Sequence, residues 1–264
     1  MMSILNQIFA HKAVEVEALK RTCPIDQMRT QAIGAPAPLD FTAALRRAPG
    51  QRPALIAEIK RASPSRGLLA PDFDPLGLAR LYCENGASAL SILTEGRYFQ
   101  GSLEILRQVA HLDLRLPLLR KDFILDPYQV YEARAAGADA ILLIASYLEA
   151  GLLRDLHSLA GDLGMAALVE VHTQAELEKA QGACQPALLG INNRNLADFS
   201  VDLSTTIRLR DLILPGVCLV AESGIHTPAD VDKLMAAGVD AVLVGEALVT
   251  AVDPSAKVRS LARS

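Results

Sequence analysis

Short apolar runs recur along the chain from residue 54 onward, and an amphipathic stretch separates each run from the next. The eight runs lie at 54–60, 89–95, 116–122, 140–146, 166–172, 187–193, 217–223 and 241–247. Each is apolar on both faces, which is typical of parallel strands covered by helices on one side and packed inside on the other. Eight strands alternating with eight helices within about 210 residues are what a (β/α)8 TIM barrel needs. We therefore predict an α/β chain of this architecture.

The stretches between the runs carry signals of helix ends. Thr227 can act as an N-cap, Pro228 fits the first helical position, and Gly238 stands where that helix should end. Two segments, EARAAGADAILLIAS and KLMAAGVDAVLVGEA, repeat the order helix, turn and strand, which is the size of one βα unit. An open doubly wound sheet is the structural alternative, but no GxGxxG follows the first strand.

Residues 1–48 stand outside this repeat. They contain two predicted helices, Ile4–Arg21 and Phe41–Arg47, with a linker rich in Ala and Pro (AIGAPAP) between them. No break in composition separates this helical extension from the barrel predicted at 53–264. We expect the chain 1–264 to form a single domain.

Composition excludes several classes of protein. The 264 residues are 51% hydrophobic with a formal net charge of -4, which excludes disorder over most of the length and gives no reason to bind nucleic acid or a membrane. Lys12, Glu15 and Glu17 interrupt the stretch that a signal peptide would need. The four cysteines and five histidines show no metal-binding spacing. We expect a cytoplasmic monomer or weak homo-oligomer without a metal or cofactor.

Polar residues end several predicted strands whose bodies are otherwise apolar. They are two lysines, three glutamates and an asparagine: Glu58, Lys60, Lys121, Glu170, Asn192 and Glu222. Counting back by twos, Leu119, Leu168, Gly190, Val220 and Leu243 share those inward faces. One strand-end charge often only reaches solvent, whereas six at one mouth predict an active site, because burying charge without a function is costly. Lysines beside glutamates can provide a proton donor and a proton acceptor near neutral pH.

Two loops that contain glycine indicate a phosphate site. Ser223–Gly224 follows the seventh predicted strand, and Gly245–Glu246 follows the eighth and opens a helical turn. These two loops form the usual phosphate site of such barrels, and glycine lets the backbone approach an oxyanion closely. Ser63 in the first loop adds a hydroxyl. Tight turns are the alternative role for the glycines. We expect His172 and His226, which follow site strands, to be solvated loop residues.

Six segments resemble the indole-3-glycerol-phosphate synthase family: AEIKRASPSRG (57–67), TEGRYFQGS (94–102), LRKDFI (119–124), LVEVH (168–172), GINNRNL (190–196) and AESGI (221–225). The resemblance covers essentially the whole chain. It implies a cofactor-free carboxy-lyase of tryptophan biosynthesis, EC 4.1.1.48. Such an enzyme converts 1-(2-carboxyphenylamino)-1-deoxyribulose 5-phosphate to indole-3-glycerol phosphate by ring closure, decarboxylation and dehydration.

The resemblance also implies a role for each candidate residue. Lys121 would be the general acid that protonates the ketone oxygen, and Glu170 would assist as the acid/base of dehydration, with Lys60 as the other proton donor. Glu58, Asn192 and Glu222 would orient the lysines and stabilise the iminium-like intermediate. The residues implied in substrate binding are Ser63, Gly224 and Gly245 for the phosphate with Ser223 nearby, Arg194 for the carboxylate, and an apolar wall of Phe99, Phe123, Leu142 and Leu196. Glu246 departs from relatives that carry a small hydroxyl residue, and we leave it outside the site.

Three other functions remain possible from the residues alone. A sugar-phosphate isomerase or epimerase would use the same phosphate loops, but gives no reason for two lysines and three glutamates. An aldolase would use Lys121 as a Schiff-base nucleophile. A non-catalytic phosphate-sensing or assembly subunit should lack strand-end acids, and this sequence has them.

Overall fold

Eight parallel strands close into a barrel in the computed structural model, which describes residues 4–48, 50–195 and 199–262. The strands are β1 (Ala54–Ile59), β4 (Ala89–Leu93), β5 (Leu118–Lys121), β6 (Ala140–Ile144), β7 (Ala166–Val171), β8 (Leu188–Asn192), β9 (Cys218–Glu222) and β10 (Ala241–Val244). Each pairs with its neighbours along the chain, and β1 pairs with both β4 and β10, which closes the ring. The predicted TIM barrel is confirmed, and the open doubly wound sheet is excluded.

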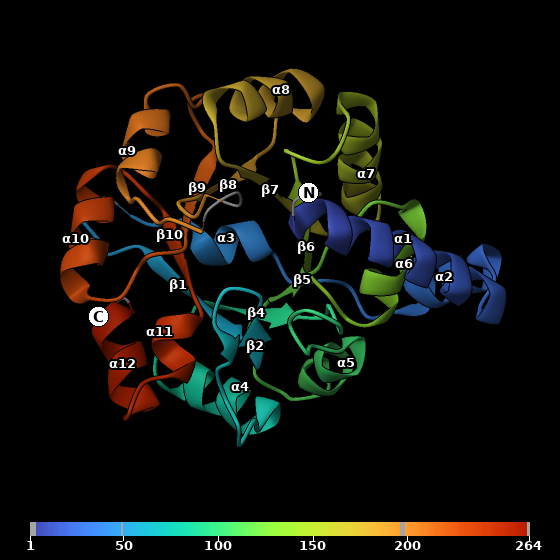
Figure 1. Cartoon of the computed structure of the whole chain (residues 1–264), viewed down its shortest axis with the longest axis horizontal. Helices are drawn as coiled ribbons and strands as arrows, with labels where there is room; N and C mark the ends of the chain where they lie inside the picture. Colours follow the sequence, from blue (N-terminus) through green and yellow to red (C-terminus); the bar gives the residue numbers. More distant parts are fainter. Residues whose placement is uncertain (1–3, 49, 196–198, 263–264) are drawn as a thin grey trace.

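Helices surround the strands and connect each to the next (Figure 1). They are α4 (Pro75–Glu84), α5 (Leu103–Ala110), α6 (Pro127–Ala135), α7 (Ala150–Asp162), α8 (Gln174–Cys184), α9 (Ser204–Arg210), α10 (Pro228–Ala236), α11 (Glu246–Val249) and α12 (Pro254–Leu261). Thr227 caps α10 in a reciprocal capping box, with Pro228 in its first turn, and Gly238 follows its end at φ 77°. These predicted helix ends are confirmed. A short hairpin, β2 (Ala62–Ser63) and β3 (Gly67–Leu68), lies in the loop after β1.

The core has two layers because successive strand residues point to opposite faces. The predicted inward residues Leu119, Leu168, Val220 and Leu243 pack together inside the barrel. Their neighbours along the strands pack outward against the helices in a second apolar cluster. On the inward face, the residue that ends a strand therefore lies directly next to the buried leucine and valine side chains inside the barrel.

Three helices precede the barrel, where the sequence predicted two. They are α1 (Ile4–Thr22), α2 (Ile25–Gly34) and α3 (Phe41–Leu45). The missed helix α2 buries only Met28 and Ala32, so its apolar pattern is weak, and it forms because it packs against α6. It also takes up the first residues of the segment predicted as a linker.

The short helix α3 lies over the middle of the ring of strands (Figure 1). Its Phe41 and Leu45 join the cluster inside the barrel, and α3 contacts β1 and β4. At the opposite end, α1 lines the mouth from which the strands' carboxyl ends emerge. In the part of the chain that the structure describes, no helix combines the length and apolar character needed to span a membrane.

Candidate active site

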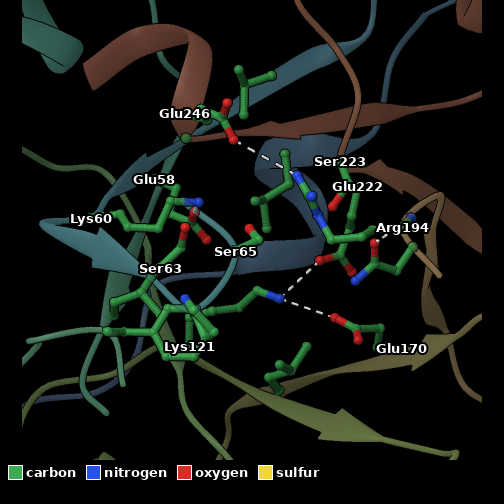
Figure 2. A pocket seen from close by; sticks show the side chains of 18 of the residues that line it. Glu58, Lys60, Ser63, Ser65, Lys121, Glu170, Arg194, Glu222, Ser223 and Glu246 are labelled. Carbon is green, nitrogen blue, oxygen red and sulfur yellow. Dashed lines mark hydrogen bonds and ion pairs between the residues drawn. The ribbon is translucent and has the colours of Figure 1, made fainter. Parts of the chain in front are cut away.

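A pocket opens at the carboxyl ends of the barrel strands (Figure 2). Fourteen of the fifteen candidate residues line it: Glu58, Lys60, Ser63, Phe99, Lys121, Phe123, Leu142, Glu170, Asn192, Arg194, Glu222, Ser223, Gly224 and Gly245. The fifteenth, Leu196, lies outside the described residues. Residues spread over most of the barrel sequence thus meet in one cavity.

Lys121 ends β5 and extends between two carboxylates (Figure 2). Its Nζ donates hydrogen bonds of 3.0 Å to Glu170 Oε2 and 3.0 Å to Glu222 Oε2. Only 14% of the Lys121 side chain is exposed. Burial opposes its charge, but the two carboxylates outweigh burial and raise the pKa of Lys121 above its usual value. This lysine therefore carries its proton at neutral pH.

The two carboxylates around Lys121 differ in proton affinity. Burial opposes the charge of Glu170, but Lys121 and His172 outweigh it and lower the pKa of this carboxyl to about 2. Burial, together with the charges of Glu170 and Glu58, raises the pKa of Glu222 to about 7 although Lys121 opposes the rise. Near neutral pH the pair around Lys121 therefore consists of one ionised carboxylate and one that can keep a proton.

Lys60 and Glu58 form the second ion pair, with 2.5 Å between Lys60 Nζ and Glu58 Oε1. They are two residues apart at the end of β1, so they share the inward face. A Cβ atom at Gly245 would collide with the Glu58 carboxylate, and one at Gly190 would collide with that of Glu222. Both glycines therefore make room for carboxylates, beyond any contact that Gly245 makes with phosphate.

Asn192, at the end of β8, joins the carboxylate cluster to the next loop. Its side chain hydrogen-bonds Glu170, and its Oδ1 accepts the backbone N–H of Arg194 at 3.0 Å. Arg194 Nη2 lies 3.7 Å from Glu246 Oε2, and Arg66 Nη2 lies 2.8 Å from Glu246 Oε1. Glu246 therefore lines the pocket and bridges two arginines. The prediction that it lies outside the site does not match this geometry.

The loop after β9 turns sharply at Ser223 and Gly224, whose φ angles are 65° and 79°. Asn193 holds this turn: its Nδ2 donates to the backbone carbonyls of Glu222 at 2.9 Å and Ser223 at 3.2 Å. Asn193 was not among the predicted site residues, although it adjoins Asn192 in GINN. Of the two predicted phosphate loops, the one after β10 leads directly into a helix, with Gly245 as the N-cap of α11, whereas α10 begins at Pro228.

A buried network supports the strand end that carries Lys121. Asp122 accepts hydrogen bonds from Thr94 Oγ1 at 2.6 Å and Arg120 Nη2 at 3.0 Å, and its Oδ1 lies 3.1 Å from Lys12 Nζ. Burial opposes the charge of Asp122, but Arg120 and Lys12 lower the pKa of this carboxyl to about 2. Lys12 belongs to α1, so this network attaches the extension beside Lys121.

Aromatic and aliphatic side chains form one wall of the pocket. Phe123 lies 5.9 Å from Phe99 between ring centroids, and it packs edge-on against Phe9 of α1 at 5.3 Å. Glu95 fixes the loop that carries Phe99 by accepting three backbone N–H groups, including that of Phe99 at 3.0 Å. The contribution of α1, which also includes Ile8, was not apparent from its sequence.

His172 does not lie in solvent as the sequence analysis expected. Its side chain is 11% exposed and lies between Glu170 and Glu176. The expectation was wrong because α8 begins immediately after the loop and brings Glu176 over the ring. His226, by contrast, is exposed at the edge of the pocket.

Comparison with known proteins identifies the family. The profile for "Indole-3-glycerol phosphate synthase" matches residues 5–261. The chain is 53% identical to the indole-3-glycerol phosphate synthase of Roseiflexus castenholzii, with 99% of this chain and 98% of that protein covered. It is 52% identical to the protein of the same name from Chlorobium chlorochromatii, over 94% of this chain and 95% of that protein. The chain belongs to the indole-3-glycerol phosphate synthase family.

Membership makes the chain a decarboxylating lyase of tryptophan biosynthesis that binds a sugar phosphate. Solved structures of lower identity show the same fold. A 3-hexulose-6-phosphate synthase matches with a TM-score of 0.64 at 15% identity, covering 79% of this chain and 97% of that one. A thiamine phosphate pyrophosphorylase from Pyrococcus furiosus matches at 0.60 with 18% identity, covering 84% and 96%.

Proposed function

We propose that the pocket closes the indole ring of 1-(2-carboxyphenylamino)-1-deoxyribulose 5-phosphate with Lys121 as the general acid. The observation that carries this proposal is the position of Lys121 Nζ, 3.0 Å from each of two buried carboxylates. Ring closure needs an electrophilic carbonyl carbon, and a proton delivered to the ketone oxygen supplies it. The aromatic carbon that bears the carboxylate then attacks, and carbon dioxide leaves as aromaticity returns.

Dehydration follows ring closure. The former ketone oxygen is now a hydroxyl group, and it leaves as water when Lys60 donates a proton to it. The ring nitrogen assists this departure through an iminium-like intermediate, and Glu170 accepts the proton that completes the indole. Glu58 orients Lys60, Glu222 orients Lys121, and Asn192 orients Glu170. The contact within each of these pairs supports its assignment.

Substrate binding uses the rest of the pocket in this proposal. Ser63 and the backbone at Gly224 and Gly245 bind the phosphate, with Ser223 beside them. Arg194 binds the carboxylate of the anthranilate group. Phe99, Phe123, Leu142 and, outside the described residues, Leu196 enclose its ring. Support comes from the positions of the described members around one cavity, with charged groups on one side and aromatic groups on the other.

The chain-level expectations remain proposals. We propose that 1–264 is a single domain, with a helical extension at 1–48 and a barrel at 53–264. We further propose that it works in the cytoplasm as a monomer or weak homo-oligomer, without nucleic acid, membrane, metal or cofactor. Support for one domain comes from Phe41 and Leu45, which the extension contributes to the cluster inside the barrel.

The two lysines can be tested against each other by substituting methionine for each. Lys121→Met should block ring closure, so neither carbon dioxide nor indole fluorescence appears. Lys60→Met should still release carbon dioxide in a single turnover, but indole should form at least about 100-fold more slowly, the scale of a lost general acid. Equal loss of both products in the two variants, or indole formation by Lys121→Met at the wild-type rate, would contradict the assignment.

A further inference from the structure

Glu170 has a cationic or ionisable neighbour at each carboxylate oxygen. Its Oε2 accepts the hydrogen bond from Lys121 Nζ at 3.0 Å, and its Oε1 lies 3.4 Å from His172 Nε2. The other ring nitrogen of His172, Nδ1, lies 3.2 Å from Glu176 Oε2. The same Glu176 oxygen accepts the backbone N–H of His172 at 2.7 Å. Glu176, His172 and Glu170 therefore form a continuous row that leads into the pocket.

The local sequence explains this row. Residues 168, 170 and 172 share the inward face of β7 because strand side chains alternate. The helix α8 begins at once, with Thr173 as its N-cap and Glu176 in its first turn. Glu176 is thus four residues after His172 and folds back over the ring. Side-chain exposure is low throughout, at 3% for Glu170, 11% for His172 and 18% for Glu176.

The contacts determine how the ring is protonated. An ionised carboxylate only accepts hydrogen bonds, so His172 Nδ1 must carry a proton to bond Glu176. A neutral ring with that proton would turn the lone pair of Nε2 toward the Glu170 carboxylate, which is repulsive. A doubly protonated ring instead carries an N–H group on each side: Nδ1 donates to Glu176, and Nε2, which has no hydrogen-bond partner among the described residues, attracts Glu170 Oε1 as an ion pair at 3.4 Å. Burial opposes this charge, but Glu176 and Glu170 outweigh it and raise the pKa of His172 above its usual value.

Among the described residues, Glu222, on the other side of Lys121, forms no ion pair besides the one with Lys121. Its Oε2 accepts from Lys121, but its Oε1 is buried and has no hydrogen-bond partner among the described residues. That oxygen lies over Gly190, which provides no side chain. The carboxylate of Glu58 also acts on Glu222 and disfavours its ionisation. His172 and Glu222 interact as well, but beyond ion-pair distance, so the two acids around Lys121 differ in which of them has the histidine as a direct partner.

We infer that His172, held by Glu176, is a positioning residue that makes Glu170 rather than Glu222 the ionised acid beside Lys121. This inference rests on the proposed role of Glu170 in the reaction. It assigns the protons in the resting pocket: Glu170 is ready to accept one, whereas Glu222 retains one near neutral pH. Without His172, the two carboxylates would compete for the same proton more evenly, and fewer molecules would hold it on Glu222.

The pH dependence of turnover tests this assignment. His172→Gln keeps an N–H donor but removes the charge, so Glu170 should bind a proton more readily. The acid limb of log kcat against pH, which reports protonation of Glu170, should move to higher pH by about one unit, equivalent to about a tenfold loss at pH values below the limb. The loss should shrink to within about threefold at pH 9, where both carboxyls are ionised in either protein, and KM should stay within about threefold. His111→Gln, which changes an exposed histidine, is the matched control and should follow the wild-type profile.

Two further variants separate positioning from general stability. Glu176→Gln should shift the limb in the same direction by a smaller amount, since it removes only the partner of Nδ1. In the Glu170→Gln background, His172→Gln should change kcat by less than about twofold, because the residue through which it acts is gone. A purely structural role would lower melting temperature and reduce activity equally in both backgrounds.

Each outcome bears on a different claim. A His172→Gln profile that superimposes on the wild type, or an additive loss in the Glu170→Gln background, overturns the inference and leaves the proposed reaction intact. Wild-type turnover by Glu170→Gln instead overturns the proposed role of Glu170. If His172→Gln does not fold, Glu176→Gln decides: a shifted acid limb supports the inference, and an unshifted one overturns it.

Discussion

Replacing Lys121 with alanine removes the cation at the centre of the pocket. In the proposed reaction this residue protonates the ketone oxygen, and loss of a general acid typically costs about 10²- to 10⁴-fold in rate. We expect the turnover of Lys121→Ala to fall by at least about two to three orders of magnitude. KM should change by less than about fivefold, because the phosphate and the anthranilate ring bind to other residues.

The same substitution leaves two buried carboxylates without their shared partner. The side chains of Glu170 and Glu222 are only 3% and 2% exposed, and breaking a buried ion pair costs about 3–5 kcal/mol in free energy of unfolding. Each carboxyl then binds a proton more tightly in the folded chain than in the unfolded one. The folded state therefore loses stability as pH rises above about 4.5, so the variant should be closer to wild-type stability at pH 5 than at pH 7.

Indole fluorescence measures turnover, and thermal unfolding at pH 5 and pH 7 measures stability. Lys233→Ala is the matched control, since Lys233 is exposed on α10 and lies outside the pocket. It should leave both measurements unchanged. Turnover of Lys121→Ala within tenfold of the wild type would remove Lys121 from the mechanism.

Three further predictions follow from the same geometry. Glu170→Gln keeps the shape but cannot exchange a proton, so kcat should fall by about 100-fold with KM nearly unchanged; a loss of thermal stability alone would mean that Glu170 is only structural. Lys12→Met leaves Asp122 buried beside a neutral side chain, so the melting temperature should drop by about 10 °C, and an unchanged melting curve would contradict this. Turnover should survive exhaustive dialysis against a chelator, since no three metal-ligating side chains group together in the described parts of the chain; activity that returns only with added metal would overturn it.

The barrel could be predicted from the sequence because its strands are buried on both faces. Runs such as 140–146 and 241–247 must be apolar throughout, and period-two alternation then identifies which strand-end residue points inward. Lys121, Glu170 and Glu222 were found in this way, and the structure brings them within hydrogen-bond distance. The sequence does not show which of these charges meet across the mouth of the barrel, because that depends on how the strands close into a ring.

The features that were missed depend on contacts between elements. α2 has a weak apolar pattern of its own and is stabilised by packing on α6. His172 follows a strand, as a loop residue would, and only the return of α8 over its ring shows that it is buried. Glu246 became part of the pocket because Arg66 and Arg194, from two other loops, reach it from both sides. His172 and Glu176 are four residues apart, but the other pairings have no fixed spacing that a single sequence reveals.

The difference between Glu170 and Glu222 also comes from the fold. Glu170 on β7 and Glu222 on β9 both lie on the inward face, on either side of β8, and both bond Lys121, so their sequence environments predict similar proton affinities. The structure separates them, with pKa values of about 2 and about 7. Burial is shared by the two, whereas among the described residues only Glu170 forms an ion pair with His172.

The most direct test of the account is the reaction itself. Purified protein is incubated with 1-(2-carboxyphenylamino)-1-deoxyribulose 5-phosphate, and indole fluorescence and released carbon dioxide are followed together. We expect fluorescence to rise in proportion to enzyme, with one carbon dioxide released for each indole formed and with no added cofactor. Folded protein that gives no indole fluorescence, or that consumes the substrate without releasing carbon dioxide, would contradict the account.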